Sequence, residues 1–201
     1  MADVKPWPMT LTGDLSDPPG RWVWIFKWLL AIPHWIVLAF LSIAQFFVTV
    51  YAFFAILFTG RYPRGAFDFN MGVLRWSWRV GFYTYQALGT DKYPPFTLDK
   101  GGYPADLDVE YPEKLSQGLV LVKWWLLAIP QYILVAIFQG GRNNPGIIPI
   151  LTVICGVILL FTGKYPEDIF KFVMGLDRWS YRVYAYALLM RDEYPPFRLE
   201  P

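Results

Sequence analysis

The hexapeptide WLLAIP occupies residues 28–33 and occurs again at residues 125–130. Three further blocks follow it in the same order in both halves of the chain: FTGRYP at 58–63 and FTGKYP at 161–166, GVLRWSWR at 72–79 and GLDRWSYR at 175–182, and YPPF at 93–96 and 194–197. Matched blocks in one order are the signature of an internal repeat. The sequence therefore predicts two tandem copies of one structural unit.

Composition places these copies in a membrane. Of the 201 residues 55% are hydrophobic and 19% aromatic, and the mean hydropathy is +0.32. No charged side chain occurs between residues 28 and 59, and only Arg142 interrupts the stretch 124–162. Such stretches exceed the roughly 20 apolar residues that cross a bilayer as a helix. The net charge of +2 offers no basic field for nucleic acid.

The four blocks resemble an actinobacterial-type integral membrane protein family that is known only as a domain of unknown function, here as a tandem duplication. The pattern that carries the resemblance is WLLAIP, TG[RK]YP, RWS[WY]R and YPPF. The resemblance implies an architecture and supplies no mechanism.

The predicted fold class is an all-α membrane protein of two tandem repeats, each a transmembrane helical hairpin followed by an amphipathic interfacial helix. The expected divisions are an N-terminal tail at 1–20, repeat 1 at 21–98 (hairpin 22–59, interfacial helix 66–88), a linker at 99–116, and repeat 2 at 117–201 (hairpin 118–162, interfacial helix 169–190). The turn-forming residues 139–146 indicate where the second hairpin reverses. By position, the first is expected to turn near residues 42–45, which gives four spans; six spans are the alternative.

Lysine and arginine placement predicts that both termini and the linker face the cytoplasm. The expected location is the bacterial cytoplasmic (inner) membrane, as a multi-pass protein. Alternating polar and apolar residues at 106–111 indicate a strand, and residues 9–12, 96–98 and 197–199 are short extended candidates. We expect some of these pieces to form a small cytoplasmic sheet.

A stripe of arginines with neighbouring tryptophans runs along each predicted interfacial helix. The candidate headgroup-binding residues are Arg75, Trp76, Arg79, Arg178, Trp179 and Arg182, because a guanidinium fork matches phosphate oxygens. The structural alternative is that the arginines pair with Asp68, Asp177 or Glu167, or with carbonyls at the hairpin ends.

Pro33 and Pro130 are expected to kink the first helix of each copy, as a packing bend or, alternatively, as a hinge. His34 and Cys155 occur once each, and both are expected to be packing residues. No metal site, cofactor or catalytic residue is predicted.

The function expected from these features is that of a non-enzymatic membrane module that organises lipids or partner proteins. Such a module would act as a homo-oligomer or as an accessory subunit of a larger membrane complex. The alternative is a small channel or carrier for an apolar or neutral solute. An enzyme acting on a lipid is disfavoured, because no acid, base or nucleophile cluster can be named.

Overall fold

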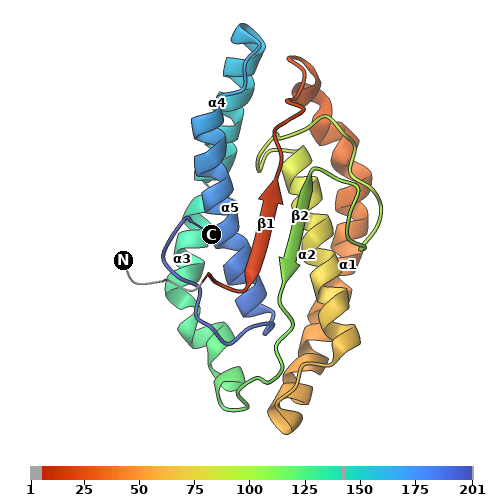
Figure 1. Ribbon diagram of the computed structural model, residues 1–201, viewed down its shortest axis with the longest axis vertical. Helices are drawn as coiled ribbons and strands as arrows, with labels where there is room; N and C mark the ends of the chain where they lie inside the picture. Colours follow the sequence, from red (N-terminus) through yellow and green to blue (C-terminus); the bar gives the residue numbers. More distant parts are fainter. Residues whose placement is uncertain (1–5, 142–143, 201) are drawn as a thin grey trace.

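The computed structural model describes residues 6–141 and 144–200 (Figure 1). The elements in this part of the chain are β1 Met9–Gly13, η1 Val23–Phe26, α1 Lys27–Thr59, α2 Arg64–Tyr83, β2 Ala105–Val109, η2 Leu119–Leu121, η3 Lys123–Leu127, α3 Ile129–Gln139, α4 Ile147–Thr162 and α5 Glu167–Ala187. η1 and η2 are 3₁₀ helices, and η3 is a π-helix.

The two copies are arranged about an approximate two-fold axis. Each supplies a strand, a long outer helical element and an inner helix: β1, α1 and α2 in copy 1, and β2, α3 with α4, and α5 in copy 2. The strands pair antiparallel with Leu11 opposite Leu107, and the outer elements run in opposite directions along the long axis (Figure 1). The axis therefore passes through the strand pair. The expected small sheet is present with two strands, whereas residues 96–98 and 197–199 form none.

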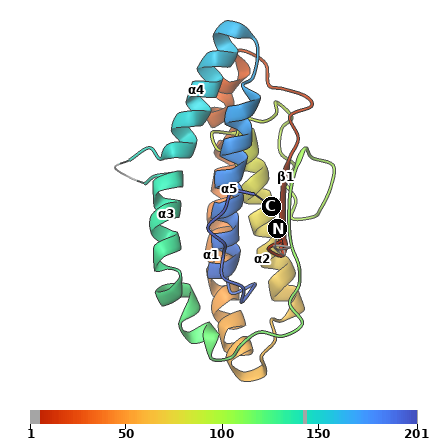
Figure 2. The same ribbon diagram turned by 60° about the vertical axis from the view of Figure 1, so that its left-hand side comes forward.

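The two predicted hairpins, and with them the four spans, are wrong. Residues 42–45 lie inside α1, which runs without interruption for 33 residues. In copy 2, α3 and α4 follow one another end to end along the long axis instead of folding back (Figure 2). Within the described residues, one helical segment, Val23–Thr59, is long and apolar enough to cross a membrane.

A six-residue insertion explains the difference between the outer elements. Pro33 and Phe58 are 25 residues apart, whereas the matching Pro130 and Phe161 are 31 residues apart. The extra residues form the loop between α3 and α4, where Gly140 and Gly146 have φ values of 80° and 74°. A Cβ on either glycine would lie within 2.5 Å of the other's backbone. Glycine at these two positions therefore allows the close backbone approach at the interruption between α3 and α4.

The inner helices do not lie flat beneath hairpins, as the sequence predicts for 66–88 and 169–190. α2 packs antiparallel along α1 and also contacts β2, and α5 packs along α3 and α4 and contacts β1. Most side chains of α2 and α5 are buried by these neighbours. The amphipathic pattern thus reflects packing between an outer helical layer and the strand layer.

The outer helices expose an apolar surface on the side away from the strands. Large side chains stand free along it, among them Phe40 (69% exposed), Phe58 (76%) and Phe161 (79%). On the strand side, Thr10 and Thr12 of β1 alternate with buried residues, as do Asp106 and Asp108 of β2. The exposed side chains of the outer helices are thus largely apolar and those of the strands polar, and the inner helices lie between these two layers (Figure 2).

A buried lysine begins the outer element of each copy. Lys27 Nζ lies 2.9 Å from Asp91 Oδ1, and Lys123 Nζ lies 2.7 Å from Asp192 Oδ1, with both lysines fully buried. Copy 2 has one residue more between the lysine and its WLLAIP block, and this residue falls in the π-helix η3. A π-helical turn takes up one extra residue. The insertion is absorbed locally, so that the lysine still meets its aspartate.

Candidate functional site

The shared motif G-x-x-R-W-S-x-R lies on α2 and α5 and binds the chain segment that follows each YPPF block. A Cβ on Gly72 would lie 2.7 Å from Leu98 Cβ, and a Cβ on Gly175 would lie 3.0 Å from Leu199 Cβ. Glycine therefore lets the segment after YPPF, residues 97–99 or 198–200 and called the returning chain below, pack directly against the helix. The first arginine, three residues later, holds the same leucine: Arg75 donates to Leu98 O at 3.0 Å.

Copy 2 repeats this contact, since Arg178 donates to Leu199 O at 2.8 Å. The second arginine binds the next residue of the returning chain: Arg79 donates to Asp99 O at 2.8 Å, and Arg182 donates to Glu200 O at 2.6 Å. Both of these second arginines are fully buried. The motif thus fastens the end of each copy to its own inner helix.

The tryptophan of the motif links the inner helix to the outer element. Trp76 Nε1 donates to His34 Nδ1 at 3.0 Å, and Trp179 Nε1 donates to Gln131 Oε1 at 2.7 Å. The His34 ring also stacks on Phe96 with centroids 4.0 Å apart. Histidine in copy 1 and glutamine in copy 2 can occupy this matched position because each offers a hydrogen-bond acceptor to the tryptophan. The geometry fits the packing role that the sequence predicts for His34.

The candidate headgroup residues lie within the fold. Four of them are buried and two are half-buried: Arg75, Trp76, Arg79 and Arg182, and then Arg178 and Trp179. The arginines bind backbone carbonyls of residues 98–99 and 199–200, not the carbonyls at the hairpin ends that the sequence suggests as an alternative. The suggested acids are engaged elsewhere, Asp68 with Arg64 and Glu167 with Lys171. A headgroup role for this set stays a prediction.

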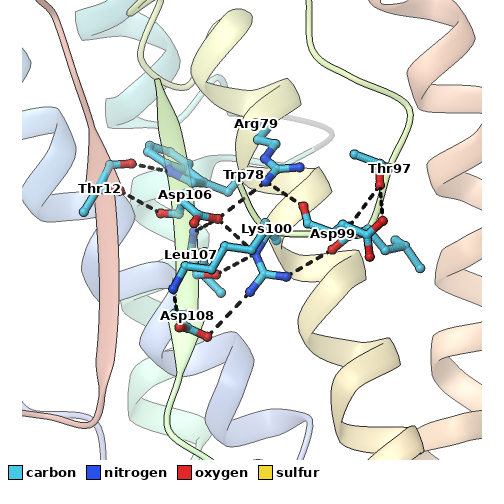
Figure 3. A network of polar contacts seen from close by, with 11 residues as sticks. Thr12, Trp78, Arg79, Thr97, Asp99, Lys100, Asp106, Leu107 and Asp108 are labelled. Carbon is cyan, nitrogen blue, oxygen red and sulfur yellow. Dashed lines mark hydrogen bonds and ion pairs between the residues drawn. The ribbon is translucent and has the colours of Figure 1, made fainter. Parts of the chain in front are cut away.

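In copy 1 the arginines meet two carboxylates of β2 (Figure 3). Arg75 Nε lies 2.9 Å from Asp106 Oδ1, and Arg75 Nη2 lies 3.5 Å from Asp108 Oδ1. Arg79 Nη2 lies 3.6 Å from Asp106, and Lys100 Nζ lies 2.7 Å from Asp108. The sequence signal for these partners is the pair of aspartates on one face of the predicted strand. It indicates the strand but does not reveal which arginines the aspartates contact.

Copy 2 lacks the corresponding acids. With Leu11 superposed on Leu107 by the two-fold axis, Thr10 and Thr12 take the places of Asp106 and Asp108. Among the described residues neither Arg178 nor Arg182 forms an ion pair. Burial, and then the nearby charges of Arg178 and Arg198, lower the pKa of Arg182 to about 10. The two motif arginines of copy 2 therefore lack the strand carboxylates of copy 1, and Glu200 opposes their charge only in part.

The tyrosine of the TG[RK]YP block joins the two copies. Tyr62 OH donates to Leu188 O at 3.1 Å, and Tyr165 OH donates to Ala87 O, the matching carbonyl of copy 1. Each copy thus reaches to the end of the other's inner helix. Neither copy completes its own packing alone.

The two prolines expected to kink the helices differ in position. Pro33 lies inside α1, whereas Pro130 lies in the first turn of α3, directly after the π-helix. In a first turn the missing amide proton has no intrahelical partner to lose. Pro130 therefore lies at the start of α3, and the kinks at Pro33 and Pro130 stay predictions.

A buried polar chain crosses between the copies near the break in the outer element of copy 2. Asp177, fully buried on α5, accepts a hydrogen bond from Gln139 Nε2 at 3.2 Å, and Gln139 Oε1 accepts one from Gln86 Nε2 at 3.2 Å. Burial raises the pKa of Asp177 well above its usual range.

An open apolar groove of about 490 Å³ lies between α1 and the start of copy 2's outer element. Its lining includes Phe46, Val50, Phe53, Phe54, Trp124 and Leu188, with Ser42, Gln45 and Thr49 as its polar members. Across residues 6–141 and 144–200, no group of three His, Cys, Asp or Glu side chains is placed to hold a metal ion.

These features define a mostly helical protein with an internal duplication and one membrane-length apolar helix. The model of a family described as a domain of unknown function (DUF4389) matches residues 21–97 and residues 125–198. The chain belongs to this family and matches it in two segments, as a tandem duplication requires. No curated protein and no solved structure matches the chain.

Proposed function

We propose that this protein is a non-enzymatic module of the bacterial inner membrane that organises lipids or partner proteins, as a homo-oligomer or an accessory subunit. The observation that carries the proposal is the apolar face of the outer helices. Phe47 is 65% exposed on α1 and Ile133 is 59% exposed on α3, in line with Phe40, Phe58 and Phe161. Apolar surface on this scale marks a lipid or protein contact.

The proposed orientation has the long axis lying in the membrane plane. A helix of 33 residues is about 50 Å long, against about 30 Å for the hydrocarbon core. The ion pairs of β2 lie beside the middle of the inner helix. If the helices crossed the bilayer, these charges would lie near its centre, at a cost of several kcal/mol each. With the long axis in the membrane plane, the charges of these ion pairs face water.

The basic residues at the two ends of α1 support the same orientation. Arg21 and Lys27 stand at its start, and Arg61 and Arg64 follow its end. Crossing would place one basic group on each side of the membrane, against the positive-inside tendency. Lying in the plane, both groups and both termini face the cytoplasm.

Cysteine labelling tests the orientation. Asp17 and Arg61 are exposed near opposite ends of α1, and each is changed singly to cysteine in a Cys155→Ala background. A membrane-impermeant maleimide should label both variants in inverted inner-membrane vesicles and neither in intact spheroplasts. Labelling of the two positions from opposite sides would establish a crossing helix instead.

The organising function is tested by what leaves the membrane with the protein. Extraction into polymer-bounded discs should retain a lipid composition that differs from the bulk membrane, or a stoichiometric partner. Phe47→Glu with Ile133→Glu should abolish membrane association, whereas Thr10→Glu on the strand face should not. Bulk lipid composition without a partner would contradict the proposal.

The apolar groove favours one second candidate, a carrier for an apolar solute. Its volume of about 490 Å³ suits a small molecule. Val50→Trp should fill it and stop solute flux into liposomes while leaving the fold intact. Unaltered flux in that variant would remove this alternative.

A further inference from the structure

The two copies form corresponding cavities beside the motif arginines, and these cavities differ in charge. In copy 1 the cavity of about 440 Å³ is lined by three basic and three acidic side chains, so that its charges balance: Arg64, Arg75 and Lys100 against Asp68, Asp99 and Asp108. In copy 2 the cavity of about 640 Å³ is lined by Lys171, Arg178 and Glu200. One positive charge is left over there.

The difference comes from individual replacements at matched positions. The exposed pair of Arg64 and Asp68 is replaced by Glu167 and Lys171, which keeps the net charge of that pair, whereas Thr12 stands where copy 1 has Asp108 and removes one negative charge. Arg178 keeps the place of Arg75 and the same contact to the returning chain, through Leu199 O. Its remaining guanidinium nitrogens have no hydrogen bond or ion pair among the described residues. Copy 2 therefore retains the arginine and lacks the strand carboxylate that pairs with it in copy 1, and the exposed Glu200 is the acidic group that acts on Arg178.

We propose that the copy 2 cavity, bounded by β1, α5 and the returning segment at Leu199, binds a small oxyanion, a carboxylate or a phosphate group. Copy 1 shows the chemistry of the ligand. There, Asp106 and Asp108 place carboxylate oxygens 2.9 and 3.5 Å from the guanidinium group of Arg75. An external oxyanion takes that place at Arg178, where the planar fork can bind two oxygens at once.

Lys171 provides a second cation at the edge of the cavity. It is exposed and 3.7 Å from Glu167, itself exposed, so this surface pair is weak and the ammonium group can turn to a ligand. The fully buried Arg182 lies one helical turn beyond Arg178 and adds a positive field that β1 does not neutralise. Glu200 stands exposed at the rim and opposes only part of this charge.

The source of the anion follows from the proposed orientation, and only this step rests on it. The cavity is lined by β1, α5 and residues 199–200, and β1 lies on the side of the inner helices away from the outer helices (Figure 2). A soluble anion can reach it there, whereas a headgroup of the bilayer under the apolar face cannot. The experiment therefore compares a soluble oxyanion with a lipid one.

Binding is measured by calorimetry on the full chain in detergent, with inorganic phosphate and with succinate, and in bilayer discs with and without phosphatidic acid. Arg178→Gln should weaken phosphate binding about tenfold or more, since a charge-assisted hydrogen bond is lost. Thr12→Asp should also abolish it, because the new carboxylate occupies the position of Asp108. Arg64→Gln, an exposed change beside the balanced cavity of copy 1, should have no effect.

Thermal unfolding shows whether each variant is folded. Thr12→Asp should have a Tm no lower than that of the parent protein, because the new carboxylate pairs with Arg178. Combining it with Arg178→Gln should remove this stabilisation. Absence of binding to all three probes, or unchanged binding in Arg178→Gln, would overturn the site. Binding of phosphatidic acid alone, lost in Arg178→Gln, would uphold the oxyanion site and refute the in-plane orientation. Membrane association is measured separately, so that failure of the oxyanion site and failure of the proposed membrane function can be told apart.

Discussion

The buried pair of Lys123 and Asp192 offers the sharpest test of the fold. Lys123 Nζ is fully enclosed and has three acceptors: Asp192 Oδ1 at 2.7 Å, Arg191 O at 3.0 Å and Leu189 O at 3.4 Å. Asp192→Asn leaves the carbonyls and removes the carboxylate that pairs with the lysine, so that Glu193 is the acidic group still acting on Lys123. Breaking a buried pair from one side costs about 3–5 kcal/mol. For a chain of this size that corresponds to a fall in Tm of roughly 10 °C.

The assay is thermal unfolding in detergent, followed by tryptophan fluorescence. Asp68→Asn is the matched control, because its pair with Arg64 is more than half exposed and is worth about 0–1 kcal/mol. The double variant Lys123→Met with Asp192→Asn should recover most of the lost stability, since no unpaired charge remains. A Tm for Asp192→Asn equal to that of Asp68→Asn would refute the assignment of a charged buried pair.

The loss should also depend on pH. Burial lowers the pKa of Lys123 even when Asp192 is present. Without the carboxylate, the folded-state pKa falls further below the unfolded value of about 10.4. The unfolded chain then binds more protons, so stability rises with pH between the two pKa values. The deficit of Asp192→Asn relative to the parent should therefore shrink as pH approaches 10, and a constant deficit would contradict this explanation.

Three other predictions use the same unfolding assay. Deleting Trp124 should be tolerated, because it converts the π-helix to the continuous α-helical spacing of copy 1, whereas deleting Trp28 should unfold copy 1 by turning the lysine about 100° from its aspartate. Asp177→Asn should raise Tm at neutral pH. Because burial raises the pKa of this carboxyl group, its contribution to the parent's stability is fully present below about pH 4 and falls as pH rises toward the folded-state pKa. The difference in Tm between Asp177→Asn and the parent should therefore vanish in acid. Gly72→Ala should cost about 1–3 kcal/mol because its Cβ would meet the returning chain at 2.7 Å, whereas Gly65→Ala, with open space around it, should be neutral or slightly stabilising.

The duplication was predictable because matched blocks recur in the same order, and β2 was predictable from the alternation at 106–111. Residues 9–12 were one of three short extended candidates, and the sequence did not indicate which of them pairs with β2. The hairpins were not, because the turn residues at 139–146 belong to an insertion that copy 1 lacks. Transferring that turn to residues 42–45 assumed a symmetry that the chain does not have. A charge-free stretch of this length fits a folded-back pair or one long helix, and only tertiary contacts decide between them.

The motif arginines show a second limit of sequence reasoning. A stripe of arginine, glycine and aromatic residues has the pattern of a helix at a lipid interface. In the structure the same stripe receives the returning chain, with Gly72 providing the space and Arg75 the hydrogen bond. The partner is a strandless segment more than twenty residues away in sequence, which periodicity within the helix cannot reveal.

The direction of the two-fold axis connects the duplication to the proposed membrane role. The axis passes through the pairing of Leu11 with Leu107 and runs across the layers, from the strands to the outer helices. Rotation about it therefore places the outer helices of both copies on the same face. If that face lies on lipid, duplication doubles the membrane contact and keeps both copies in one orientation relative to the bilayer. With the helices crossing the membrane, the same rotation would invert copy 2, and the basic ends of the two copies would then lie on both sides. The symmetry and the charge distribution are thus compatible in the in-plane orientation and in conflict in the crossing one.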